Sequence, residues 1–228
     1  MTSASTKAAV IVGIVLALAV GTFAGYIIKN NMVEMDSQTS TVTTTASSTK
    51  AADLRVTMNN LLREHVSSSL IVTRNIVDGA SAEKIEGAKV AQTANAVAIA
   101  TAVGSIYGED AQTAITTPFV EHIAQSNNYA QAVADNNMAA QETSLTALRA
   151  ELRKVATVFN SVIPSLPVDT LYEALSAHED LLNQAAVAYK AGNYEEAYRL
   201  ENDALVQISG GAEALSTGII ASKPDMFK

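Results

Sequence analysis

Leu61-Leu62-Arg63-Glu64-His65-Val66 is the stretch of this chain that decides its fold, because related stretches occur twice more. They are Phe119-Val120-Glu121-His122-Ile123 and, more loosely, Leu175-Ser176-Ala177-His178-Glu179. The chain has no other histidines, and these three are 57 and 56 residues apart. Glycine or asparagine stands fourteen residues after each histidine, and both types tolerate the left-handed conformation that ends a helix. The spacing predicts one helical unit that is repeated three times along the chain.

Apolar residues recur around each histidine at the steps of a helix with one buried face. The first stripe is Met58, Leu62, His65, Ser69, Val72 and Ile76, in a helix expected to open near Asp53. The other two are Ile115, Phe119, His122, Ser126, Tyr129, Val133 and Leu171, Leu175, His178, Leu182, Ala185, Tyr189. A return helix should follow each, and in the first of them we expect Ile85, Val90, Ala94, Val97 and Thr101 to face the core. The predicted fold class is all-α, an up-down antiparallel bundle of three repeated helical hairpins, preceded by one transmembrane helix.

The segment before the bundle predicts an attachment to a membrane. Residues 8–28 form an apolar run of 21 residues between Lys7 and Lys29, long enough to cross a bilayer as a helix. A cleaved signal peptide is the alternative. Residues 1–7 are too few to fold, so we expect a short cytoplasmic N-terminus, a Ser/Thr-rich linker over 29–50 and a bundle domain over 51–228 outside the cytoplasm. The predicted location is therefore the cell membrane, with a single pass through residues 8–28.

Composition excludes several classes of function. The net charge is −8 and there is no basic stripe, so nucleic acid is not an expected partner. The absence of cysteine excludes disulfides, thiolate metal sites and a cysteine nucleophile. No G-x-S-x-G motif occurs, and no acid–base pair has diagnostic spacing. We therefore expect no enzymatic activity.

His65, His122 and His178 are the candidate metal ligands. They occupy equivalent positions on helices that run parallel in an up-down bundle, so their imidazoles could meet and bind Zn²⁺ or Cu²⁺. The glutamate beside each histidine points about 100° away and cannot readily serve the same site. A di-iron site of the Glu-x-x-His type is excluded, because Leu62, Phe119 and Leu175 stand three residues before the histidines. The alternative is three buried, hydrogen-bonded histidines, each with a solvated glutamate beside it.

Two charged clusters are typical of solvated helix faces. One contains Arg149, Arg153 and Lys154, and the other contains Glu195, Glu196, Arg199 and Glu201.

The repeat resembles a family of small helical bacterial proteins. The matching positions are Leu61–Val66, Thr73-Arg74, Ile106-Tyr107-Gly108 and the segments 188–194 and 215–220. Members carry an L-R-x-L-W-x-E-H-V-x-W-T-R opening, a Y-G hinge, a second E-H-I segment and a closing G-I-I. This chain departs from the pattern by lacking the tryptophans and the histidines of the last helix. The resemblance implies the helical fold and no particular activity.

The sequence thus favours a membrane-anchored domain with a binding role, whose ligand is a metal, a small molecule or a surface partner. The alternative is a structural cell-surface or filament subunit that assembles with copies of itself. Gly21 and Gly25 form a G-x-x-x-G pattern within the apolar run, which is typical of paired membrane helices. A protein partner or a homo-oligomer is compatible with either hypothesis.

Overall fold

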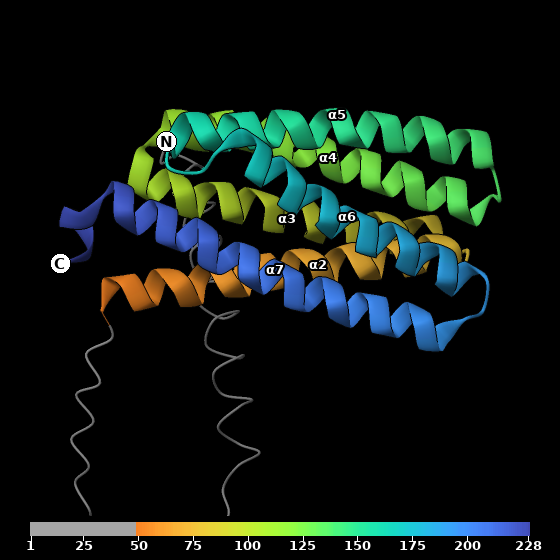
Figure 1. The fold of residues 1–228 in the computed structure, drawn as a ribbon. Coiled ribbons are helices and arrows are strands. Elements are labelled where there is room, and N and C mark those ends of the chain that lie inside the picture. The colour runs from red at the N-terminus through yellow and green to blue at the C-terminus, as the bar shows by residue number, and fades with distance from the viewer. Residues whose placement is uncertain (1–48) are drawn as a thin grey trace, which may run out of the picture. The chain divides into compact units, whose positions relative to one another are not determined.

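The computed structural model describes residues 49–228, and this range is helical without any β-strand. Its elements are α2 (Lys50–Val77), α3 (Ala82–Tyr107), α4 (Glu109–Ala134), α5 (Met138–Val162), α6 (Val168–Lys190), α7 (Tyr194–Ser222) and the 3-10 helix η1 (Pro224–Phe227). Figure 1 shows the helices lying alongside one another as a bundle. The all-α prediction is confirmed, whereas the transmembrane helix predicted over residues 8–28 lies outside the described residues.

Three helix ends close with the same backbone hydrogen bonds. Gly79, Asn136 and Gly192 have positive φ angles of 65°, 53° and 76°. In each case the next residue donates its N–H to a carbonyl five residues back: Ala80 to Asn75, Asn137 to Ala132 and Asn193 to Ala188, at 2.9, 2.9 and 3.0 Å. This is the Schellman arrangement, which satisfies carbonyls left free at a helix end. The left-handed conformation predicted at these three positions is present.

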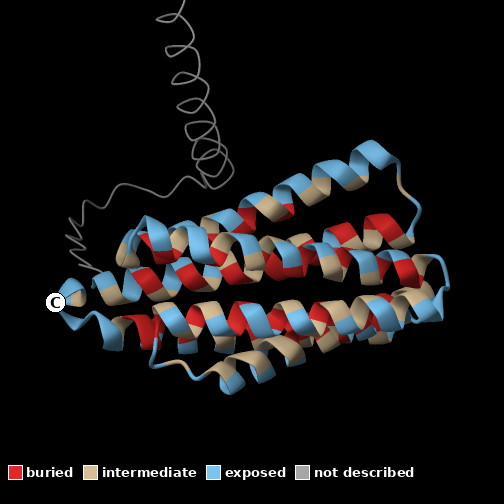
Figure 2. Cartoon of the chain, turned by 90° about the horizontal axis from the view of Figure 1, so that it is seen from above, coloured by how far each residue is buried: buried red, intermediate tan, exposed pale blue. Residues whose placement is uncertain are grey.

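The helices that carry the histidines form the centre of the bundle. α2, α4 and α6 contact one another, while α3 packs against α2 and α4, α5 against α4 and α6, and α7 against α6 and α2. The α2 stripe predicted from the sequence is buried along its whole length. Figure 2 shows that buried residues gather on the sides of the helices that face each other. Burial of these side chains places the three histidines in the interior.

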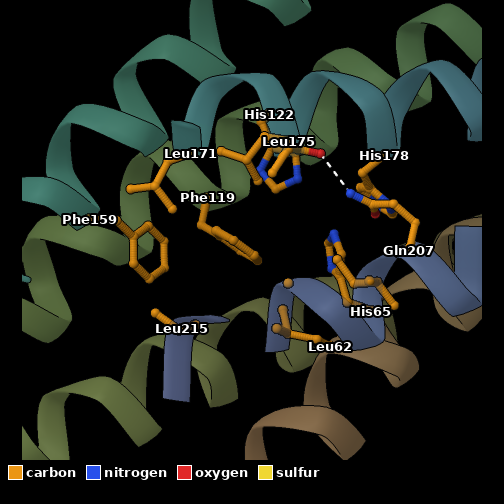
Figure 3. A pocket seen from close by; sticks show the side chains of 13 residues that line it. Leu62, His65, Phe119, His122, Phe159, Leu171, Leu175, His178, Gln207 and Leu215 are labelled. Atoms are coloured by element: carbon orange, nitrogen blue, oxygen red, sulfur yellow. Dashed lines mark hydrogen bonds between the residues drawn. The ribbon is translucent and has the colours of Figure 1, made fainter. Parts of the chain in front are cut away.

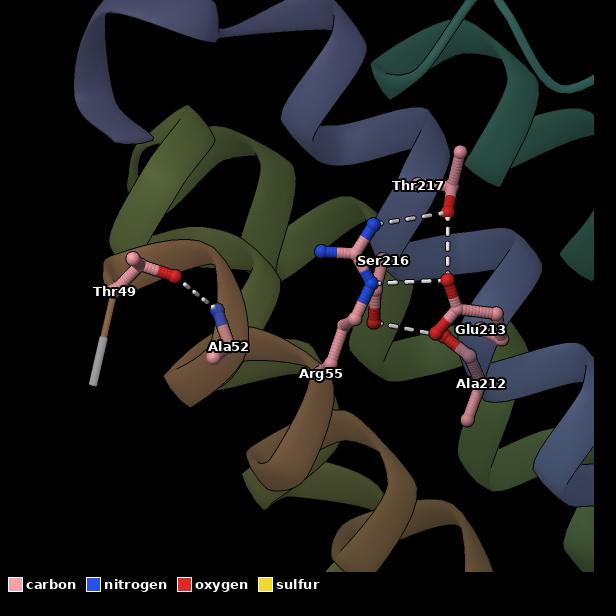
Figure 4. Close-up of polar contacts among 7 residues, drawn as sticks. All are labelled: Thr49, Ala52, Arg55, Ala212, Glu213, Ser216 and Thr217. Carbon is pink, nitrogen blue, oxygen red and sulfur yellow. Dashed lines mark hydrogen bonds and ion pairs between the residues drawn. The ribbon is translucent and has the colours of Figure 1, made fainter. Parts of the chain in front are cut away.

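The beginning of α2 differs from the expectation. Thr49 caps the helix, because its hydroxyl accepts a hydrogen bond from the Ala52 N–H at 3.2 Å, and Asp53 lies in the first turn (Figure 4). Arg55 then fixes this end of α2 to α7 by donating from Nε to the Glu213 carboxylate at 2.9 Å. A threonine hydroxyl is a good acceptor for the free N–H groups of a first turn, which explains the earlier start.

The buried face of α3 is not the one predicted. Val90 and Val97 are 60% and 38% exposed, and Ala94 and Thr101 also face solvent. The buried face instead contains Gln92, Asn95, Ala96, Ile99, Ala100, Val103 and Gly104. α3 is rich in alanine and is therefore apolar on most sides. The side of α3 that faces the core is set by the buried amides of Gln92 and Asn95. Gln92 donates to the Ser69 hydroxyl and accepts from Asn127, each at 3.0 Å, and these bonds turn it inward.

α7 is the one helix in the described range that is long and apolar enough to cross a membrane, judged over its most apolar 18-residue window. Within the bundle, 39% of that window is buried. Length and composition alone also admit a core helix of a soluble domain. This helix gives weak support for membrane association.

We expect residues 49–228 to fold when produced alone, because Ser47–Lys228 form one compact unit that contains the core. Far-ultraviolet circular dichroism should show helical minima and a cooperative thermal transition. Val90→Asp should leave both unchanged, whereas Ile99→Asp, at a fully buried position of the same helix, should abolish the transition, since it buries an unpaired charge. A spectrum without helical minima for the unsubstituted fragment contradicts the expectation.

Candidate functional site

The three histidines meet in the interior of the bundle. His65 comes from α2, His122 from α4 and His178 from α6, and each is at most 3% exposed. The ring centroid of His65 lies 5.5 Å from that of His122 and 6.0 Å from that of His178. Figure 3 shows the imidazoles from three helices around a common space. The sequence-based expectation that the rings converge therefore agrees with the structure, while their role as metal ligands stays a prediction.

A cavity of about 80 Å³ lies between these rings. Its polar lining consists of the three imidazoles and the Gln207 side chain, and no charged residue lines it. The remaining lining residues are Leu62, Phe119, Phe159, Leu171, Ala174, Leu175, Ile208, Gly211 and Leu215. An apolar chamber with a few convergent polar groups is the usual form of a small-molecule site.

Phe119 holds the imidazoles in place. Its ring meets the His122 ring edge to face at a centroid distance of 4.7 Å, and it lies 5.2 Å from the His65 ring. On its other side it meets Phe159 at 6.3 Å. Such contacts are worth about 0.5–1.5 kcal/mol beyond the buried area, so the ring positions are fixed by packing on the apolar side of the cavity.

Several nitrogens of the imidazoles have no hydrogen-bond partner within residues 49–228. These are Nδ1 of His65, Nδ1 of His122 and both ring nitrogens of His178. Oε1 of Gln207 is buried without a partner as well. A buried polar atom without a partner costs about 1–3 kcal/mol, and most such atoms in proteins are satisfied by protein, water or ligand. These five atoms belong to the four polar residues that line the cavity, which makes it the candidate site.

The imidazoles are neutral at physiological pH. Burial lowers the pKa of His65 from 6.5 to about 4, opposed by the neighbouring Asn95 amide, and lowers the pKa of His178 to about 3. The pKa of His122 also lies well below its ordinary value, because of burial and then of the two other histidines. Each neutral ring offers one N–H and one lone pair. The cavity therefore presents hydrogen-bonding groups without positive charge.

Glu179 is the residue of this region that the sequence did not reveal. It was expected to be solvated like its counterparts Glu64 and Glu121, but it is 1% exposed, while those two are exposed. Its Oε1 lies 3.8 Å from Nε2 of His122, and its Oε2 accepts a hydrogen bond from Ser126 at 3.1 Å. Burial raises the pKa of Glu179 to about 7, although the Ser126 bond and Arg149 act in the other direction. The carboxyl therefore faces His122 across the α4–α6 contact.

The charged clusters on α5 and α7, which were predicted to face solvent, are only partly exposed. Arg149 pairs with Asp180 of α6, and Arg153 pairs with Asp169 and stacks on Tyr172 at 3.8 Å. Glu201 is buried and pairs with Arg74 of α2, so its prediction as an exposed residue was wrong. The reason is that the facing helices supply charged partners, which a single helical pattern does not show.

As the side chains stand, residues 49–228 contain no group of three or more histidine, cysteine, aspartate or glutamate residues placed to hold a metal ion. The fold and the site together define a helical bundle with a buried, histidine-lined cavity. The chain matches no protein-family model, no curated protein and no solved structure. The family resemblance noted in the sequence therefore stays an expectation about the fold.

Proposed function

We propose that residues 51–228 form a non-enzymatic binding domain that holds a small ligand in the histidine-lined cavity. The observation that carries this proposal is that the four polar residues lining an apolar cavity, His65, His122, His178 and Gln207, all hold buried atoms without a hydrogen-bond partner. A ligand that donates to or accepts from these atoms recovers the free energy lost by burying them unpaired. A purely structural core would gain more from leucine at these positions.

The location proposed for this domain rests on the sequence. The apolar run over residues 8–28 would anchor the chain in the cell membrane, and the linker over 29–50 would hold the bundle outside the cytoplasm. Three copies of one helical hairpin, derived from an internal duplication, would explain why the central helices each contribute a histidine. A binding domain held at the membrane surface is compatible with the acidic, cysteine-free composition.

The alternative is a structural subunit that assembles with copies of itself. It is favoured by exposed apolar side chains on the adjacent helices α2 and α7, namely Val56, Ile71, Tyr198 and Val206, each more than half exposed. Size-exclusion chromatography with light scattering distinguishes the two. A monomer that retains a ligand supports the binding domain, and an oligomer without a ligand supports the subunit.

Native mass spectrometry of the full chain, purified in detergent without chelator, tests the proposal. We expect an added mass on the wild-type chain, and occupancy about tenfold lower for His122→Leu, which removes a polar wall of the cavity. Asn127→Leu is the matched control, since Asn127 is a buried polar residue of the same helix that does not line the cavity. A wild-type chain that carries no added mass, and takes none up from a small-molecule cell extract, contradicts the proposal.

Zn²⁺ or Cu²⁺ is the second candidate ligand. Three imidazoles around one such ion, at metal–nitrogen distances of about 2.0–2.1 Å, have ring centroids roughly 5–5.5 Å apart. The observed 5.5 Å between His65 and His122 lies at the upper end of this range and the 6.0 Å between His65 and His178 exceeds it, so the His65 and His178 rings would have to move closer to bind the ion. Since burial keeps the imidazoles neutral far below pH 6.5, binding should persist into mildly acidic solution. Elemental analysis of the wild type beside His178→Ala decides between a metal and an organic ligand.

A further inference from the structure

Access to the histidine-lined cavity lies between α6 and α7. The lining residues from α2, α4 and α5, which are Leu62, His65, Phe119, His122 and Phe159, are all buried. Those that reach the surface are Ala174, which is exposed, and the half-buried Leu171, Leu175, Gln207 and Gly211. All of them belong to α6 or α7. These five residues are called the mouth below.

Gln207 bridges the mouth. Its Nε2 donates a hydrogen bond to the Ala174 carbonyl at 2.9 Å, which links α7 to α6 (Figure 3). Its Oε1 is buried and has no partner within residues 49–228. One side-chain hydrogen bond of this kind contributes only about 0.5–1.5 kcal/mol and can open transiently. The amide is therefore placed both to close the mouth and to meet a ligand that passes it.

Gly211 follows Gln207 by one helical turn and leaves the mouth open. A glycine within a helix costs about 1 kcal/mol relative to alanine. Close helix packing does not require it here, because a Cβ at position 211 would meet no atom within 4 Å. Its neighbour Gly210 has equally free surroundings but does not line the cavity. The missing side chain at 211 thus keeps a passage that any larger residue would narrow.

The lining also restricts the chemistry of the ligand. A charged organic molecule would lose its hydration without meeting an opposite charge, because no charged side chain lines the cavity. Neutral imidazole nitrogens and the free Gln207 oxygen provide acceptors for an O–H or N–H group. The 80 Å³ volume is smaller than the roughly 150 Å³ apolar cavity that holds benzene, so a ring would extend into the mouth.

We infer that the ligand is a small uncharged molecule with an apolar body and a hydrogen-bond donor, such as a phenol or an alcohol, and that it enters between α6 and α7 past Gln207 and Gly211. This inference rests on the proposed function, since it names the ligand class of the same cavity. It assigns Gln207 and Gly211 to the control of access. It also assigns the histidines to recognition of the polar end.

The test uses the full chain in detergent with ¹³C-labelled histidine. The chain has only three histidines and all three line the cavity, so every histidine signal reports on this site. Phenol and toluene have nearly the same shape, but only phenol donates a hydrogen bond. We expect phenol to shift the ring signals at a concentration about tenfold lower than toluene, the effect of about one hydrogen bond. Benzoate, which is charged, should leave the signals unmoved.

Two glycine variants test the route. Gly211→Leu should weaken phenol binding at least about tenfold, whereas Gly210→Leu should bind like the wild type. Equal affinity for toluene and phenol, or binding of benzoate, overturns the ligand class. Equal effects of the two glycine variants overturn the route. If no probe binds while native mass spectrometry still finds a ligand, the inference fails and the proposed function stands; if neither experiment finds binding, both fail.

Discussion

Lowering the pH from 7 to 5 should reduce the free energy of unfolding of the bundle by about 3 kcal/mol through the buried histidines and Glu179 alone. The folded-state pKa values of His65, His122 and His178 all lie below the ordinary 6.5. Between pH 6.5 and pH 4 the unfolded chain therefore binds more protons than the folded one. The stability that the neutral rings provide is present above pH 6.5 and is lost as the pH falls.

Glu179 acts in the opposite direction over part of this range. Its folded-state pKa of about 7 lies above the ordinary 4.5, so its contribution is complete below pH 4.5 and is lost as the pH rises through 7. Each proton is worth about 1.4 kcal/mol per pH unit. From pH 7 to pH 5 the histidines together cost roughly 5–6 kcal/mol, and Glu179 returns roughly 2 kcal/mol.

Urea unfolding of residues 49–228 at pH 7 and pH 5 measures the difference, and Glu179→Gln is the matched variant. The amide cannot take up a proton, so the variant should lose roughly 2 kcal/mol more than the wild type over the same range. It should also lose the decline in stability that Glu179 causes between pH 7 and pH 8.5. Equal unfolding midpoints at pH 7 and pH 5 would show that the imidazoles are not neutral and buried.

The parts of the fold that could be predicted are those with large apolar side chains at regular steps. Met58, Leu62 and Val72 lie on one face of α2, so only one rotation of the helix buries all of them. This face of α2 is buried as expected. The positions with φ above zero could also be predicted from the sequence, because glycine and asparagine are the residues that best tolerate this conformation. Both patterns depend on residues close together in the chain, so a single sequence is enough to recognise them.

The face of α3 could not be predicted, because alanine gives little preference for one side over another. Its rotation is decided by Gln92 and Asn95, whose partners Ser69, Asn127 and the Leu61 carbonyl lie on two other helices. Buried amides gain their stability only from those partners. Their inward position follows from the assembled bundle rather than from the pattern of α3.

The candidate site was predictable in its histidines and not in their surroundings. Equal spacing along the chain places three imidazoles at similar heights, and the rings do lie 5.5 and 6.0 Å apart around His65. Glu179 was missed because its carboxyl group lies near His122, which belongs to another helix. Gln207 was missed because its hydrogen-bond partner, the Ala174 carbonyl, lies on another helix. Contacts between helices depend on helix rotation, which one sequence specifies only through packing.

Arg74→Leu should lower the free energy of unfolding by roughly 2–3 kcal/mol, because it leaves the Glu201 carboxylate buried without its partner. Arg74 donates to both carboxylate oxygens, from Nε to Oε1 at 3.1 Å and from Nη2 to Oε2. Its guanidinium also lies 5.1 Å from the centroid of the Tyr198 ring. The figure is set below that of a fully buried pair because the Arg74 side chain is 36% exposed, whereas that of Glu201 is 10% exposed.

The double variant Arg74→Leu/Glu201→Leu should recover most of this loss, since replacing both members of a buried ion pair with apolar residues is often neutral or stabilising. Arg199→Leu is the matched control: Arg199 is on α7 and pairs with Glu196 and Asp203, but at the surface, so its loss should leave the unfolding midpoint nearly unchanged. Urea unfolding at pH 7 measures all three variants. If the double variant is as unstable as Arg74→Leu, the cost comes from lost packing of the arginine against Tyr198 and Tyr189, and the carboxylate is not the cause. If it is restored, the α2–α7 contact depends on charge neutralisation of Glu201 by Arg74.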